Sequence, residues 1–86
     1  MYNYETEKQN LFTEQGQRMF LSIRDNVKNI LKESGAIMMQ NAISGQSGST
    51  WTMLACVDRL VELEEIKEIN QKGVAGQHRV FVSITN

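Results

Sequence analysis

The sequence of 86 residues contains no proline, one cysteine and one histidine. The single cysteine, Cys56, cannot form a disulfide within the chain, so a reducing environment is expected. One thiol and the imidazole of His78 do not supply the three or four ligands of a zinc site. No spacing places a base and an orienting group beside Cys56 or a serine, so the sequence predicts no enzyme activity and no cofactor.

Long apolar runs are also missing. Charged or amide side chains interrupt every stretch well before the roughly 20 residues that a membrane helix needs. The chain does not begin with the basic, apolar and small-residue regions of a secretory signal. We therefore expect no membrane association and a cytoplasmic location.

Neither charge sign dominates, because 9 Lys and Arg face 10 Asp and Glu. This balance excludes an evenly basic nucleic-acid coat but says nothing about local patches. Acidic residues concentrate between Asp58 and Glu68, whereas Arg24, Lys28 and Lys32 form a basic stripe at helical spacing. With 41% hydrophobic residues, the chain can form one small domain, and a dimer would add buried surface.

Because proline is absent, glycines divide the chain into blocks. The first block predicts a helix from about Thr13 to Ser34, with Thr13 as its N-cap and Gly35 just beyond its end. Its apolar side chains recur at spacings of three and four, namely at Phe20, Ile23, Val27, Ile30 and Leu31.

Two further helices are expected after Gly35. Residues 36–44 predict a short helix, and residues 45–49 offer a tight turn with Ser49 as a cap. The helix from Thr50 to Leu63 has a core stripe of Met53, Leu54, Val57, Leu60 and Val61. Its opposite face is predicted to be exposed and to carry Trp51, Thr52, Ala55, Asp58, Arg59 and Glu62.

The last block predicts a β-hairpin. Val80, Val82 and Ile84 alternate as on a strand with one buried face, and 66–70 is the expected antiparallel partner. Residues 71–77 would form the hairpin tip.

The order helix, helix, turn, helix and hairpin resembles a winged helix-turn-helix domain. The segment 48–66, reading GSTWTMLACVDRLVELEEI, is similar to the recognition helix of winged-helix transcriptional regulators. Such regulators commonly have glycine where this chain has Glu64, because the backbone there takes a left-handed turn. The resemblance implies an α+β, mainly helical fold, with an N-terminal arm at 1–12 and a winged domain at 13–86.

The resemblance also implies binding of double-stranded DNA. A recognition helix places its first residues in the major groove, and its wing reaches the backbone or minor groove. Arg59 is the best candidate for a guanine contact, and Lys72 for a phosphate contact. The full set of predicted DNA-binding residues is Gln46, Ser47, Ser49, Thr50, Trp51, Thr52, Ala55, Arg59, Lys72, Gln77, His78 and Arg79.

An alternative use of the same fold is protein binding. In that hypothesis Trp51 anchors an interface, and the acidic band from Asp58 to Glu68 meets a basic partner. A role as an accessory piece of a larger assembly, such as a phage-encoded factor, is a further possibility.

The arm at 1–12 mixes aromatic and apolar side chains with amides and acids. A frayed tail is the ordinary state of a terminus. The clustering of Tyr2, Tyr4, Leu11 and Phe12 favours packing against a second subunit, so a homodimer is expected.

Overall fold

A computed structural model describes residues 1–69 and 76–84, apart from the side chain of Gln77. The arm forms a short helix α1 (Tyr4–Glu7) and a 3-10 helix η1 (Lys8–Phe12). The long helix α2 (Glu14–Ser34) follows. Thr13 is its N-cap, and the Thr13 hydroxyl accepts a hydrogen bond from the N–H of Gly16. Gly35 is its C-cap, with a φ of 78°. The predicted limits and caps of this helix are confirmed.

The block after Gly35 differs from the prediction of a single short helix. Residues Ala36–Met38 form strand β1, and only Met39–Ala42 form a helix, α3. The three residues Ala36, Ile37 and Met38 pair with the C-terminal strand, so tertiary pairing overrides the local helical spacing.

Helix α4 (Thr50–Glu62) has Ser49 as its N-cap, as predicted. Two residues beyond α4, Glu64 has a φ of 60°, in the left-handed region. This is the position where winged-helix regulators, which the sequence resembles, commonly have glycine. The structure therefore contains the predicted turn, made by a residue that adopts it at a conformational cost.

Strands β2 (Ile66–Glu68) and β3 (Val80–Ser83) pair antiparallel, as predicted, with Ile66 opposite Ser83. β3 is the central strand of a three-stranded sheet of order β1-β3-β2. The predicted buried face of β3 was wrong, because Phe81 is fully buried whereas Ile84 is exposed. Of the predicted hairpin tip, residues 71–75 lie outside the described part, and Gly76–His78 form a 3-10 helix, η2.

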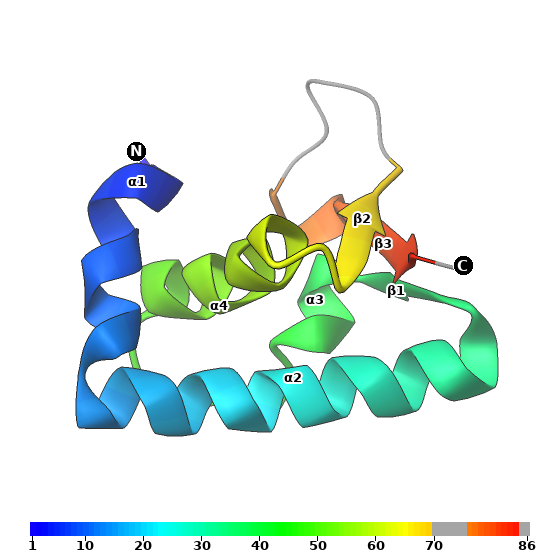
Figure 1. Ribbon diagram of the computed structural model, residues 1–86, viewed down its shortest axis with the longest axis horizontal. Helices are drawn as coiled ribbons and strands as arrows, with labels where there is room; N and C mark the ends of the chain where they lie inside the picture. Colours follow the sequence, from blue (N-terminus) through cyan, green and yellow to red (C-terminus); the bar gives the residue numbers. More distant parts are fainter. Residues whose placement is uncertain (70–75, 85–86) are drawn as a thin grey trace.

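Figure 1 shows α2 as the base of the molecule, with α4 lying over it. The arm rises from the N-terminal end of α2, and the sheet lies toward its other end. One core joins these elements, formed by Leu11, Phe20, Ile23, Val27, Leu31, Ile37, Met39, Ala42, Met53, Ala55, Cys56, Val57, Leu60, Ile66 and Phe81. The chain is thus an α+β, mainly helical domain in which α2 and the sheet hold α4 in place.

No helix among the described residues combines the length and apolar character needed to cross a membrane.

Candidate nucleic-acid interface

The start of α4 is shaped by the turn that precedes it. The Ser49 hydroxyl accepts the N–H of Thr52 at 3.4 Å, which satisfies one of the free donors at the start of the helix. In the turn, the side-chain amide of Gln46 donates to the Ser22 hydroxyl of α2 at 2.9 Å. This bond links the turn to α2 close to the polar groups around Ser49.

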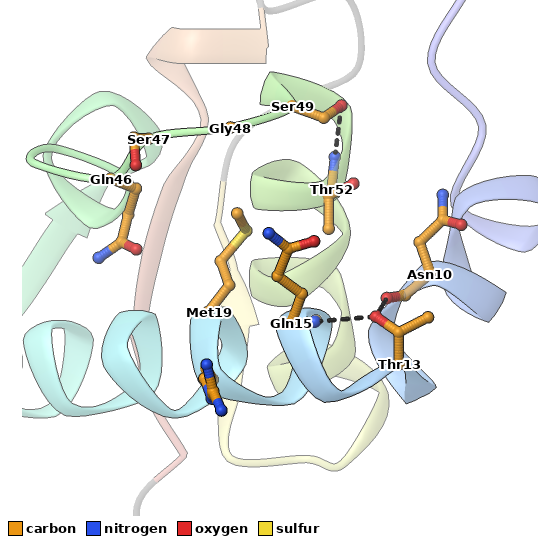
Figure 2. Close-up of a pocket in the computed structure, with 11 residues that line it drawn as sticks. Asn10, Thr13, Gln15, Met19, Gln46, Ser47, Gly48, Ser49 and Thr52 are labelled. Atoms are coloured by element: carbon orange, nitrogen blue, oxygen red, sulfur yellow. Dashed lines mark hydrogen bonds between the residues drawn. The ribbon is translucent and has the colours of Figure 1, made fainter.

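A cavity of about 540 Å³ opens beside this turn. Four of the predicted DNA-binding residues line it: Gln46, Ser47, Ser49 and Thr52. The remaining wall comes from the arm and the start of α2, and Figure 2 shows Gln15 and Met19 rising from α2 toward the segment 47–49. The lining residues outside the predicted set are Asn10, Thr13, Gln15, Gly16, Arg18, Met19 and Gly48.

One residue of the sequence, Gly16, indicates that the arm lies against the start of α2 in this part of the cavity wall. Gly16 had no role in the predicted helix, yet a Cβ built on it would lie 2.0 Å from the carbonyl oxygen of Asn10. The arm therefore packs directly on the backbone of α2 at this glycine. That close approach places Asn10 and Thr13 at the edge of the cavity.

The charge of the cavity differs from that of the rest of α4. Its described lining holds one basic side chain, Arg18, and no carboxylate. Arg18 forms an ion pair with Glu14 one turn earlier on α2. Amide and hydroxyl groups dominate the surface, and the first turns of α2 and α4 both border it with the positive ends of their helix dipoles.

Trp51 stands in the first turn of α4 with 44% of its surface exposed, as the sequence predicted. Thr50 beside it is also exposed. An exposed indole next to hydrogen-bonding groups is a surface suited to contact with another molecule.

Farther along α4, the outer face (Ala55, Asp58, Arg59 and Glu62) is not open in the way that the sequence predicted. Ala55 is fully buried, so its predicted place in a DNA groove was wrong. The arm lies against this part of the helix. Its contacts are Tyr2 Oη to Asp58 Oδ2 at 2.6 Å, Tyr4 Oη to Glu62 Oε1 at 2.7 Å and Lys8 Nζ to Glu62 Oε2 at 2.6 Å.

Arg59, which was predicted to contact guanine, binds other side chains of the same chain. Its Nη1 donates to Glu62 Oε1 at 2.7 Å, and its guanidinium lies 5.5 Å from the centre of the Phe12 ring. Hydrogen bonds from Lys8, Tyr4 and Arg59 lower the pKa of Glu62 to about 2. Glu62 is thus a shared acceptor that ties the arm and Arg59 to α4.

Arg79, predicted to reach DNA from the wing, is also engaged. Its guanidinium lies 2.7 Å from Asp58 and 2.9 Å from Glu68, and it stacks over the Phe81 ring at 5.2 Å. Burial by itself would lower the pKa of Arg79, but the hydrogen bonds to Glu68 and Asp58 outweigh burial and raise it. A cation so paired is not free for a phosphate.

His78 is exposed in η2. Lys72 and the side chain of Gln77 lie outside the described residues.

Three of the four residues predicted for a dimer interface pack within their own chain. Leu11 is 1% exposed, so it belongs to the core and is not available to a second subunit. Tyr2 and Tyr4 are half-buried beside the core. Burial is the main cause that raises the pKa of both hydroxyls, and their hydrogen bonds to carboxylates raise it further. Phe12 is 58% exposed.

The acidic band from Asp58 to Glu68 is largely neutralised by cations of the same chain. Asp58 and Glu68 share Arg79, Glu62 pairs with Lys8 and Arg59, and Glu65 lies 3.1 Å from Lys28 of α2. The predicted role of this band, attraction of a basic partner, is therefore weakened by internal pairing.

Cys56 is fully buried, and burial raises the pKa of its thiol to about 12. The thiol thus remains protonated and acts as a small core residue. The described residues contain no group of three or more His, Cys, Asp and Glu that could hold a metal ion.

Comparison of the chain with protein-family models, with curated proteins and with solved structures gave no match.

Proposed function

We propose that the chain is a small winged-helix DNA-binding protein that acts in transcriptional regulation. In this proposal α3 and α4 form the helix-turn-helix, and β2 and β3 frame the wing. The element order α2, β1, α3, α4, β2, β3 and the sheet order β1-β3-β2 are compatible with this architecture.

One observation carries the proposal: the start of α4 gathers uncharged hydrogen-bonding groups from three segments around one cavity, next to an exposed Trp51. Phosphate oxygens accept hydrogen bonds from hydroxyls, amides and the backbone N–H groups of helix starts. The cavity lining includes hydroxyl and amide side chains and no carboxylate, and the Gln46 amide and the Thr13 hydroxyl already donate hydrogen bonds within the chain. A DNA backbone would therefore be bound here, with Thr50 and Trp51 directed toward the adjoining groove.

The proposal differs from the sequence-based expectation in its electrostatics. Because Arg59 and Arg79 are paired within the chain, few cations remain to neutralise phosphates. If two or three phosphates are neutralised by Lys or Arg side chains, affinity should fall about 10- to 40-fold between about 50 and 200 mM salt. A strongly basic DNA-binding surface would show a steeper dependence.

Thr50→Glu tests the surface directly. A carboxylate in the first turn favours the helix dipole, so α4 should stay folded while the start of the helix becomes negative. Binding of a fluorescein-labelled random duplex at low salt should weaken about tenfold, because one charge repulsion near the contact is worth about 1 kcal/mol or slightly more.

Asn29→Glu is the matched control. It adds the same charge at an exposed position of α2, away from the start of α4. Its duplex affinity should stay within about twofold of the unchanged chain, since exposed charges beyond a Debye length are screened. Equal weakening by both substitutions would argue against the assigned surface.

Protein binding is the second candidate function, and two observations favour it: Trp51 is exposed, and Arg59 and Arg79 are paired within the chain. An aromatic anchor without nearby free charge is typical of a protein interface. Titration with random duplex DNA separates the two candidates, because a protein-binding domain of this kind would show almost no affinity at any salt concentration.

A further inference from the structure

The first residues of the chain are attached to α4 through two carboxylates. The segment Tyr2–Lys8, called here the strap, is joined to α4 by three side-chain contacts, and all of them end on the carboxylates of Asp58 and Glu62. Helix α1 within the strap has no buried residue. The strap is therefore held by two hydrogen bonds and one ion pair, together with the partly buried rings of Tyr2 and Tyr4 that pack against the core.

The arm is anchored differently just after the strap. Leu11 is inserted in the core, and Asn10 and Leu11 pack on the backbone of Gly16. Detaching residues 10–12 would expose the buried Leu11 and open a tight contact between backbones, whereas detaching the strap would remove from the core only the partly buried rings of Tyr2 and Tyr4. The 3-10 helix η1 is thus a natural pivot between a fixed and a detachable part of the arm.

The position and charge of the strap bear on DNA binding. It lies on the outer face of α4, the face that a recognition helix turns toward the major groove. It also carries Glu5 and Glu7 against the single cation of Lys8. A closed strap adds bulk and negative charge where a duplex would approach.

We propose that the strap is an autoinhibitory segment that covers the outer face of α4 and must detach before this face can contact duplex DNA. The inference rests on the proposed DNA-binding function. With the strap closed, only the start of α4 is available. Duplex binding and strap closure then compete, so whatever loosens the strap strengthens binding.

The double substitution Tyr2→Phe with Tyr4→Phe tests the inference without changing any charge. It keeps both rings and removes the two hydroxyl donors to Asp58 and Glu62. The expected result is about fivefold or greater tightening of random-duplex binding at low salt, because the competing closed state becomes less populated. Hydrogen exchange of residues 3–8 should become faster, with the exchange of α2 unchanged.

A lysine pair provides a second, charge-matched comparison. Lys8→Gln removes the ion pair with Glu62, and Lys32→Gln removes an exposed lysine from the far end of α2. Simple electrostatics predicts that loss of either lysine weakens duplex binding. An autoinhibitory strap predicts that Lys8→Gln binds duplex more tightly than Lys32→Gln.

The inference is overturned if the tyrosine double variant binds duplex no more tightly than the unchanged chain, or if exchange of residues 3–8 is not accelerated. In that case duplex binding persists and is still weakened by Thr50→Glu. Failure of the proposed function looks different, since then neither the unchanged chain nor the double variant binds duplex, and the strap has no DNA binding to inhibit.

Discussion

Among single residues, Gly16 decides whether the arm can pack on α2. An added Cβ would lie 2.0 Å from the Asn10 carbonyl oxygen and 2.9 Å from the Leu11 Cα. These are backbone atoms, so the contact can be relieved only by moving the arm. We predict that Gly16→Ala lowers the free energy of unfolding by about 1–3 kcal/mol, the usual cost of overpacking, as measured by urea unfolding.

The sign of this effect is informative. At an open helical position the same substitution would stabilise the protein by up to about 1 kcal/mol, because alanine has the higher helix propensity. Gly76→Ala is the control, since nothing lies within 4 Å of its added Cβ, and it should change stability by less than about 0.5 kcal/mol. An increase in stability with Gly16→Ala would contradict the packing of η1 on α2.

At the level of secondary-structure elements, α4 depends on Glu62 for its links to the arm. Hydrogen bonds from Lys8, Tyr4 and Arg59 lower the pKa of this carboxyl to about 2. A carboxyl whose pKa is depressed on folding stabilises the protein above its ordinary pKa, and the contribution is lost as the pH falls through the folded value. The contribution of Glu62 should therefore be complete at neutral pH and disappear between about pH 4.5 and 2.

Glu62→Gln should accordingly be less stable than the unchanged chain at pH 7, and the difference should shrink as the pH approaches 2. Urea unfolding at a series of pH values measures it. Glu33→Gln, at an exposed position of α2, is the control and should show no comparable pH-dependent difference. A difference for Glu62→Gln that is constant with pH would show that the carboxylate is not the group that holds the arm.

The sequence predicts some secondary-structure elements of this fold better than others. Periodicity and capping residues located α2 and α4, because Thr13, Gly35 and Ser49 act through local hydrogen bonds and backbone geometry. Strand β1 and the buried face of β3 were missed. Both depend on the pairing of Ile37 with Phe81, a contact between residues distant in sequence.

The candidate site was predictable only in part, for a related reason. The polar start of α4 and the exposed Trp51 follow from helical geometry. The ion pair of Arg59 with Glu62, three residues later on the same helix, follows from helical geometry too. The pairing of Arg79 with Asp58 and Glu68 and the stacking of Arg59 on Phe12 do not, since these contacts join different elements. The helical pattern of α4 likewise gave no indication that the arm would lie on its outer face.

For the molecule as a whole, the near balance of charges has a structural meaning. Many of the acidic and basic side chains are paired across elements: Lys8 with Glu62, Lys28 with Glu65, and Arg79 with Asp58 and Glu68. These pairs join the arm, α2 and the sheet to α4 and its C-terminal end. The start of α4 is the part of that helix left for hydrogen bonding with another molecule.

Trp51 is the only tryptophan of the chain, so its fluorescence reports on the start of α4 without any label. The most direct test is a titration with a random duplex of about 20 base pairs, following Trp51 emission together with the anisotropy of the labelled duplex. The account predicts saturable quenching that parallels the anisotropy and shifts about tenfold or more to higher concentration between about 50 and 200 mM salt. A rise in anisotropy without a change in Trp51 emission, or no change in either signal up to about 0.1 mM duplex, would contradict it.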